Sequence, residues 1–355
     1  MTRLAIIDRA DMNAEKARVY DAAKLAGGPV GGPYYAYIRL PKLFEASQNL
    51  RGCLAAGPLS KREQQVVNLV VARYWGARYP WFAQVRASLA AGIPQSVVDE
   101  VFSVHFNDPE SLDRRIAELD GEGRKPACMI MEPAMMNLGV VLPEPGYLEA
   151  VREITRRHGV VLIFDEVKTG LCIAAGGAVE RFGVMPDMVT LAKALGGGMP
   201  VGAIGGSEEV MSVVEDGSVF QVGTYNGNPL GMAAARANLT EVLTPEAYQH
   251  LDALNDRILR GCSDVIERYG LSGYSVGVGS KGCVTFSPAK IVDYETFKEN
   301  QDAELADLAW LFNMNRGIFM TPGREEEWTL SVTHTDESID AYVAVFDEMA
   351  EALTS

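Results

Sequence analysis

The sequence predicts a helical N-terminal domain, then an α/β domain and a smaller C-terminal α+β domain. The chain has 355 residues, and soluble domains usually contain about 100–200 residues, so two or three are expected. Residues 1–103 carry 13 Lys or Arg against 8 Asp or Glu, a net charge of +5, and the total of −15 leaves −20 for the remainder. The hydrophobic pattern changes near Val104 from helical spacing to alternating strands and helices. We therefore place the domains at residues 1–103, 104–250 and 251–355.

Composition excludes several classes of protein. With 48% apolar and 22% charged residues, the chain is an ordinary globular protein rather than a disordered one or a fibre. Its apolar runs are shorter than the roughly 18 residues that a membrane span needs. Asp8 interrupts the opening apolar residues, so we expect no secretion signal and a cytoplasmic protein. The acidic balance disfavours nucleic acids as partners, and the five widely spaced cysteines predict neither disulfides nor a zinc site.

The first domain is predicted to be helical. Ser60 and Glu63 have the spacing of a capping box, and Val66, Val67, Val70 and Val71 follow at helical intervals. A second periodic stretch covers residues 81–91 and ends at a glycine. These signals alone indicate only a small α-helical domain.

Residues 1–102 resemble the carboxymuconolactone decarboxylase and AhpD-like family. The matching stretches are NAEKARVYD at 13–21, LSKRE at 59–63, VARYWGA at 71–77 and AGIP at 91–94. The chemistry of that family depends on a cysteine pair, or on an acid and a histidine near the start of its second helix. This chain has Pro80, Trp81, Phe82 and Gln84 there. Since thiol exchange needs two thiols and proton transfer a titratable group, we expect a packing or oligomerisation role for this domain.

Alternating strands and helices are predicted after Val104. Residues 128–132, 159–164, 188–191 and 201–204 are short apolar strands, and residues 147–158 and 229–243 are helices. The run at 159–164 is apolar throughout, as expected for a parallel strand buried on both faces. In such architecture, ligands bind beyond the carboxyl ends of the strands.

Two ionisable residues fall at those ends. Asp165 follows the strand at 159–164, and Lys193 closely follows the strand at 188–191, just before three consecutive glycines at 196–198. Singly, each is expected to be an ordinary exposed charge. Together, they offer an amine that can form a Schiff base and a carboxylate that can hold a pyridinium nitrogen protonated. The glycines let a cofactor approach the backbone closely.

From about Phe106 to the C-terminus, the chain resembles the class III pyridoxal-phosphate aminotransferases, within them the glutamate-1-semialdehyde aminomutase branch. The matching motifs are EP at 132–133, LIFDEV at 162–167, FGVMPD at 182–187, LAKALGGGMPVGA at 191–203, GTYNGNP at 223–229 and VTHT at 332–335. The resemblance implies fold type I of the pyridoxal-phosphate transferases and pyridoxal 5'-phosphate as cofactor. It implies that Lys193 carries the cofactor as a Schiff base, Asp165 holds its ring nitrogen and Val167 packs on its ring. Gly223 and Thr224 belong to the motif whose threonine donates to the phosphate, usually across a subunit interface, so we expect a homo-oligomer.

The resemblance is incomplete. Family members carry over a hundred residues before the Glu-Pro strand, including a Ser-Gly-Thr-Glu-Ala-like loop that cradles the phosphate, and the helical domain stands in that place here. The chain therefore resembles a fusion with an incomplete phosphate site. Arg324 is a candidate for binding a substrate carboxylate, with a solvated surface arginine as the alternative.

The sequence thus predicts a pyridoxal-phosphate-dependent aminotransferase. It would move an amino group between an amine or amino acid and a keto or aldehyde acceptor through Lys193. Two alternatives stay open. An aminomutase would use the same residues and retain its intermediate, whereas a scaffold or oligomer would have little cofactor chemistry.

Overall fold

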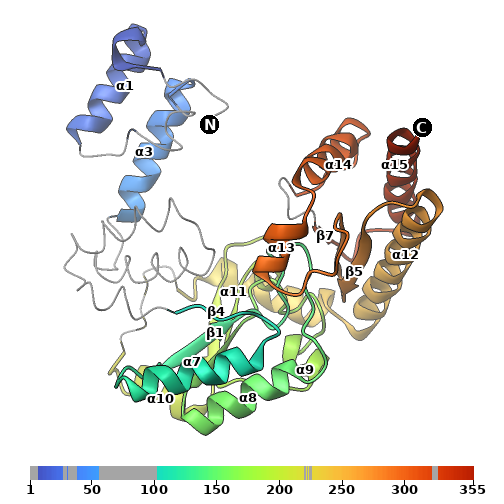
Figure 1. Ribbon diagram of the computed structural model, residues 1–355. Helices are drawn as coiled ribbons and strands as arrows, with labels where there is room; N and C mark the ends of the chain where they lie inside the picture. The colour runs from blue at the N-terminus through green and yellow to red at the C-terminus, as the bar shows by residue number, and fades with distance from the viewer. Residues whose placement is uncertain are drawn as a thin grey trace. The chain divides into compact units, whose positions relative to one another are not determined.

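The chain divides into two compact units, Met1–Phe102 and Ser103–Ser355 (Figure 1). The computed structural model describes residues 7–26, 30, 38–55, 102–219, 221, 223, 226–321 and 327–355. In the described residues no helix is both long and apolar enough to cross a membrane. The helices expected after Ser60 and over residues 81–91 lie outside this description.

The described part of the first unit is helical. A 3-10 turn, η1 (Arg9–Asp11), precedes the helices α1 (Ala14–Leu25) and α3 (Pro41–Ala55). Helix α1 begins after Asn13 because the side chain of this residue accepts a hydrogen bond from the Lys16 amide at 3.0 Å. A small core joins the two helices, formed by Val19, Ala23, Ile38 and Phe44.

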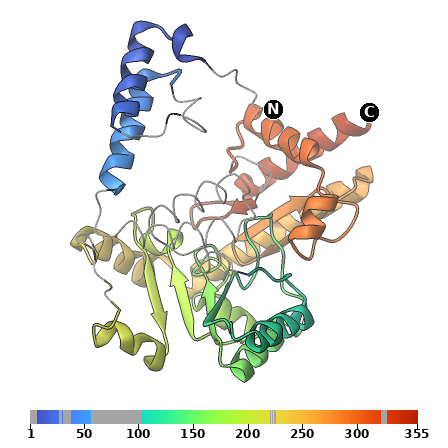
Figure 2. The same ribbon diagram turned by 60° about the vertical axis from the view of Figure 1, so that its left-hand side comes forward.

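The second unit contains a four-stranded sheet in the order β1-β2-β3-β4, whose strands are drawn in green to yellow-green in Figure 2. Strands β1 (Cys128–Met131), β2 (Val161–Asp165) and β3 (Met188–Leu191) are parallel. Strand β4 (Ala203–Gly206) is antiparallel to β3. Only eleven residues join β3 to β4, and they include the 3-10 turn η2 (Lys193–Gly196), so the connection is too short for a parallel crossover.

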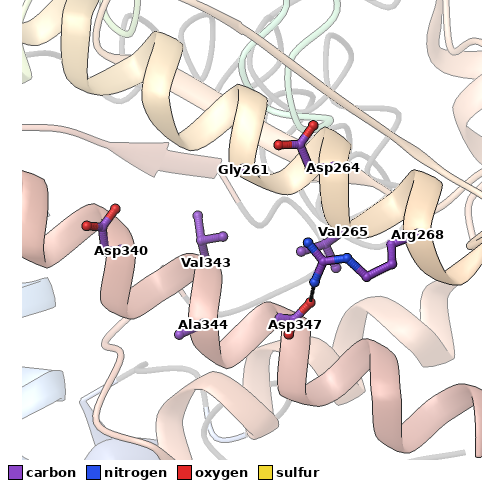
Figure 3. Close-up of a pocket in the computed structure, with 8 residues that line it drawn as sticks. All are labelled: Gly261, Asp264, Val265, Arg268, Asp340, Val343, Ala344 and Asp347. Carbon is purple, nitrogen blue, oxygen red and sulfur yellow. Dashed lines mark hydrogen bonds and ion pairs between the residues drawn. The ribbon is translucent and has the colours of Figure 1, made fainter.

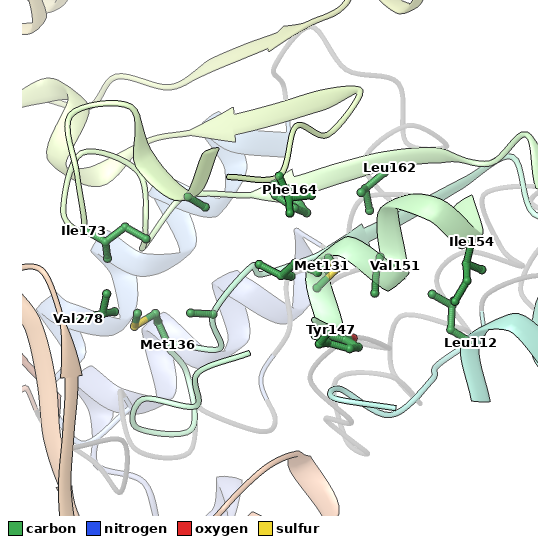
Figure 4. Close-up of a cluster of buried hydrophobic side chains, with 14 of the residues drawn as sticks. Leu112, Met131, Met136, Tyr147, Val151, Ile154, Leu162, Phe164, Ile173 and Val278 are labelled. Atoms are coloured by element: carbon green, nitrogen blue, oxygen red, sulfur yellow. The ribbon is translucent and has the colours of Figure 1, made fainter. Parts of the chain in front are cut away.

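The same part of the chain contains four helices: α7 (Pro109–Gly121), α8 (Tyr147–His158), α9 (Gly177–Phe182) and α10 (Glu208–Glu215). The core contains Leu162 and Phe164 of β2, both fully buried, and Val151 of α8 (Figure 4). The other side chains of β2, Val161 and Ile163, are half-buried. The prediction of a strand buried on both faces is therefore met only on the face of Leu162 and Phe164, against which α8 packs.

The C-terminal part is built around an antiparallel sheet of β5 (Tyr274–Val278), β6 (Lys281–Thr285) and β7 (Glu327–Thr329). The other elements of this part are α12 (Pro245–Tyr269), α13 (Tyr294–Asn300), α14 (Ala303–Asn315) and α15 (Asp336–Thr354). Between the two parts of the chain, α11 (Pro229–Ala237) and the π-helical turn η3 (Asn238–Val242) pack against η2. The helix predicted over residues 229–243 is thus α-helical only as far as Ala237. Helix α12 runs through the domain boundary expected at residue 250, and its Leu251 and Ile258 join the C-terminal core.

Candidate active site at the ends of strands β2 and β3

Asp165 is the last residue of β2 and pairs in register with Thr190 of β3. Its Oδ1 accepts hydrogen bonds from the Val167 amide at 3.1 Å and from the Thr190 hydroxyl at 3.3 Å. Among the described residues, no donor is bonded to Oδ2. The carboxylate is therefore oriented by its neighbours while one oxygen stays available for a protonated ring nitrogen.

The turn after β2 is held by Glu166. Its buried Oε2 accepts from the Ala178 amide at 2.7 Å and from the Thr169 hydroxyl at 3.3 Å, and burial raises the pKa of this carboxyl. The turn also lies against β3: a Cβ added to Gly170 would stand 2.3 Å from Cδ2 of Leu191. Only glycine fits here, so the turn packs directly on the strand that leads to Lys193.

Lys193 opens the turn η2 with φ of 45°, in the left-handed region that non-glycine residues rarely adopt. This conformation costs roughly 1–2 kcal/mol. Asn238 stabilises the turn, since its Nδ2 donates to the Ala194 carbonyl at 2.7 Å. Strained backbone of this kind concentrates at functional sites, and here it occurs at the one lysine that the sequence singled out.

The pKa of Lys193 is lowered. Desolvation is the largest cause, followed by the positive charges of Lys168 and Lys281. The residue is nevertheless exposed, so the amine is both reachable and biased towards its uncharged, nucleophilic form.

Glu132, directly after β1, is a third ionisable group here, and we did not predict it as a site residue. It is buried and accepts hydrogen bonds from the Met136 amide at 2.7 Å and from the Asn137 side chain. Burial, reinforced by the charge of Asp165, raises the pKa of Glu132 to about 7. The signal was in the sequence, because Glu132 also follows an apolar strand.

Lys168, Lys281 and Glu327 form a further charged group that sequence analysis missed. Glu327 Oε1 lies 2.9 Å from Lys168 Nζ and 3.3 Å from Lys281 Nζ. All three side chains are largely buried, and the two lysines act electrostatically on Lys193. Because the members are up to 159 residues apart, no local pattern reveals them.

The structure thus brings Asp165, Val167 and Lys193 to one edge of the sheet. The Gly223 carbonyl accepts a hydrogen bond from the Asn226 amide at 2.9 Å, and a Cβ added to Gly223 would stand 2.7 Å from Asn226 Oδ1. Thr224 and Arg324 lie outside the described residues, so their predicted roles stay predictions.

These residues fit a pyridoxal-type cofactor at the ring end. Asp165 presents an oriented oxygen, Lys193 a reachable amine with lowered pKa, and Val167 an apolar side chain two residues from Asp165. The described residues show no group of three or more side chains suited to a metal ion.

A groove between α12 and α15 is a separate feature. It measures about 320 Å³ and is lined by Gly261, Asp264, Val265, Arg268, Asp340, Val343, Ala344 and Asp347 (Figure 3). Arg268 Nη1 bonds Asp347 Oδ1 across it at 2.5 Å. None of the candidate residues lines this groove, and its chemistry is that of a surface ion pair.

Residues 84–299 match the family model described as aminotransferase class-III. The match begins inside the region that we predicted to be a separate helical domain. Curated relatives include glutamate-1-semialdehyde 2,1-aminomutase 2 of Brevibacillus brevis, 39% identical over 263 residues that cover 74% of this chain and 60% of that protein. The glutamate-1-semialdehyde 2,1-aminomutase of Aquifex aeolicus is 37% identical over 250 residues, 70% of this chain and 58% of that protein.

Solved structures show the same similarity. An omega-transaminase from Sphaerobacter thermophilus has a TM-score of 0.67 and 32% identity, over 73% of this chain and 59% of that one. A glutamate-1-semialdehyde-aminomutase from Pseudomonas aeruginosa PAO1 in complex with PMP has a TM-score of 0.64 and 26% identity, over 71% of this chain and 56% of that one. The chain spans about 60% of the length of the curated relatives that it matches.

Proposed function

The chain belongs to the class-III aminotransferase family, and we propose that it is a pyridoxal 5'-phosphate-dependent aminotransferase. It would transfer an amino group from an amine or amino acid to a keto or aldehyde acceptor. The observation that carries this proposal is the pairing of β2 with β3, which sets the oriented carboxylate of Asp165 beside the strand that leads to Lys193. Family members use pyridoxal phosphate, and one solved relative was crystallised with PMP.

Each residue has a distinct task in this proposal. Asp165 Oδ2 would accept a hydrogen bond from the protonated ring nitrogen and so keep that nitrogen charged. The Thr190 hydroxyl and the Val167 amide hold Oδ1 in place. The Val167 side chain would cover the ring. Thr224, in the motif that begins at Gly223, would donate to the phosphate, and Arg324 would bind a substrate carboxylate.

When bound, the cofactor supplies an aldehyde that reacts with amines and a ring that accepts electrons from the substrate carbon. Lys193 would provide the amine that holds the cofactor. When it is not bound to the cofactor, its uncharged Nζ would serve as the base that takes up and gives back the proton of the substrate carbon. The lowered pKa of Lys193 matches this task, because a protonated amine cannot act as a base.

An aminomutase of the glutamate-1-semialdehyde type is the second candidate, favoured by the identity of up to 39% with such enzymes. The two differ in stoichiometry: an aminotransferase converts equal amounts of donor and acceptor, whereas an aminomutase isomerises one substrate without net transfer. The third candidate, a scaffold with impaired catalysis, remains because the chain lacks the sequence of the phosphate-cradling loop.

Two further parts of the proposal concern assembly. We propose that the chain forms a homo-oligomer in which Thr224 serves the phosphate of a neighbouring subunit. Exposed apolar side chains on α11 and η3, Leu230, Met232, Leu239 and Val242, are consistent with a self-associating surface. The first unit would contribute packing surface, as its resemblance to carboxymuconolactone decarboxylases implies, and no chemistry. Sedimentation showing a monomer that still binds cofactor tightly would contradict the shared site.

The decisive experiment follows the cofactor linkage. Purified protein incubated with pyridoxal phosphate should turn yellow, lose the colour on borohydride reduction, and carry the cofactor on Lys193 in peptide mass spectrometry. The matched control is Lys193→Ala, which should stay unlabelled. A colourless wild-type protein that takes up no cofactor would support the scaffold instead.

A further inference from the structure

The side chain of Asn238 contacts the turn that carries Lys193. Its Nδ2 donates to the carbonyl of Ala194, 44 residues earlier in the chain, at 2.7 Å and lies 3.5 Å from the carbonyl oxygen of Leu195. Two carbonyl oxygens need a donor, so it is the amide nitrogen that faces the turn. Asn238 also lies against Gly197, where an added Cβ would stand 3.5 Å from the Asn238 Cβ. One side chain thus contacts three of the four residues that follow Lys193.

The backbone of this turn is strained. Lys193 has φ of 45°, and Gly197 and Gly198 have φ of 54° and 101°; only at Lys193 does a side chain make the left-handed conformation costly. The hydrogen bonds within the turn are short-range, from the Leu195 amide to the Ala192 carbonyl at 3.0 Å and from the Gly197 amide to the Ala194 carbonyl at 3.1 Å. Bonds of this kind close turns of either hand. They therefore do not by themselves fix the left-handed form.

The helix that presents Asn238 changes its form at this residue. Helix α11 ends at Ala237, and the π-helical turn η3 begins at Asn238, whose carbonyl accepts from the Leu243 amide at 2.9 Å. Asparagine is a poor helix former because its side chain competes for backbone hydrogen bonds. Single π-helical turns are rare and frequently occur at functional sites. Both features point to the contact with η2, rather than helix stability, as the role of Asn238.

We propose that Asn238 is a positioning residue that holds the turn η2 in its left-handed form and thereby fixes the direction in which Lys193 presents its amine. The Cα–Cβ bond of Lys193 turns with its backbone, so relaxation of this residue to a right-handed conformation would point the amine elsewhere. The inference deepens the proposed function, on which the role of Lys193 rests.

Two substitutions remove the donor in different ways. Asn238→Ala deletes the amide but keeps the Cβ beside Gly197, and the Ala194 carbonyl retains its bond from the Gly197 amide, so no acceptor is stranded. Asn238→Asp keeps the shape, but its carboxylate cannot donate and would face carbonyl oxygens. The matched control is Thr240→Ala in the same turn η3. Thr240 is exposed, and its hydroxyl donates to the Arg236 carbonyl of its own helix at 2.9 Å.

The first measurement follows the turn itself, by hydrogen exchange of peptides that cover residues 194–199 in the full chain without added cofactor. Exchange in Asn238→Ala should be roughly 3- to 10-fold faster than in the wild type, which corresponds to the loss of one net hydrogen bond. Asn238→Asp should exchange faster still, and Thr240→Ala should match the wild type. Unchanged exchange in both Asn238 variants would overturn the inference.

The second measurement follows the amine. The full chain is mixed with pyridoxal phosphate, reduced with borohydride at set times, and scored for label on Lys193 and, as an internal reference, on the exposed Lys298. Labelling of Lys193 in both Asn238 variants should be about tenfold slower, since a misplacement of about 1 Å can cost up to 10²-fold. Lys298 labelling and the melting temperature should stay close to those of the wild type, which a merely structural role would not produce.

Faster exchange with unchanged Lys193 labelling would also overturn the inference, because the turn would then loosen without misplacing the amine. A wild type that carries no label on Lys193 would instead refute the proposed function. The exchange measurement would still decide whether Asn238 holds the turn, so the two failures are distinguishable.

Discussion

At the scale of single residues, Lys193 combines three unusual properties. Its backbone is left-handed, its pKa is lowered, and its side chain remains exposed. A lysine without a function would relax to an ordinary conformation and a fully hydrated charge. These properties separate it from the other lysines in the described residues and make its substitution the most direct test.

Lys193→Ala should abolish transamination while the protein stays folded, since the amine contributes no described hydrogen bond to the structure. Loss of a general base alone lowers rates by roughly 10²–10⁴, and loss of the cofactor linkage should add to this. Steady-state kinetics and circular dichroism would check the two parts. Lys193→Gly should be equally inactive but about 1 kcal/mol more stable than Lys193→Ala in urea unfolding, because glycine adopts positive φ without strain. Wild-type turnover by either variant would refute the assignment.

Glu132 should make stability depend on pH. Its pKa of about 7 in the folded protein lies above the ordinary value of 4.5, so the folded state binds a proton that the unfolded state has released between these values. The contribution is therefore fully favourable below pH 4.5 and is lost as the pH rises through 7.

Glu132→Gln should remove this dependence and gain up to roughly 3 kcal/mol relative to wild type at pH 8. The gain is partly offset because an amide cannot accept both hydrogen bonds that Glu132 receives. Urea unfolding at pH 5 and pH 8 measures the difference, with Glu295→Gln, at a half-exposed side chain, as control. If the stability of the wild type and of Glu132→Gln changed equally between pH 5 and pH 8, Glu132 would be charged in the folded protein over this whole range.

At the scale of elements, the hairpin of β5 and β6 carries Lys281 towards the site. Its turn at Gly279 and Ser280 packs on the segment after β2, where the Ser280 amide and hydroxyl both donate to the Cys172 carbonyl at 3.0 Å. Gly279 has φ of 58°, and an added Cβ would stand 2.4 Å from the Ile173 Cα. The hairpin thus joins the C-terminal sheet to the segment that follows β2 through close backbone contacts.

Gly279→Ala should destabilise the protein by roughly 3 kcal/mol, because it adds a backbone clash to the cost of positive φ. The matched control is Gly270→Ala at the end of α12, which has φ of 62° and open space around its Cβ. That variant should lose only about 1 kcal/mol. Chemical denaturation of both variants measures their free energies of unfolding. Equal losses of stability would mean that the hairpin shifts to accommodate the added Cβ without further destabilisation.

At the scale of the whole molecule, the second unit has two large hydrophobic cores, one beneath the four-stranded sheet and one between α12, α15 and the C-terminal sheet. Both sheet edges within the described residues carry exposed apolar side chains, Ile130 on β1 and Ile204 on β4. Exposed edges of this kind promote association between chains.

A fragment starting at Val104 should therefore be insoluble or free of cofactor, because it loses whatever packing surface residues 1–103 provide. Expression of the fragment beside the full chain, followed by sedimentation and cofactor uptake, tests this. A soluble, yellow and active fragment would show that the second unit needs nothing from the first.

The sequence by itself determined the chemistry at the edge of the sheet. Asp165 and Lys193 each end an apolar run, and the carboxyl ends of parallel strands meet at one edge, so their neighbourhood follows from local pattern alone. The positions of β1 to β4 were equally predictable, to within about two residues, because short apolar runs between turn signals are a local property, whereas β5, β6 and β7 were not predicted.

Only the tertiary structure decided the electrostatics of that edge. The Lys168, Lys281 and Glu327 cluster joins segments up to 159 residues apart, and the pKa of Glu132 depends on burial by distant elements. The antiparallel direction of β4 and the continuity of α12 through residue 250 likewise depend on what packs against them. Local sequence specifies which groups are present, whereas desolvation and charge proximity arise only when the folded chain brings remote segments together.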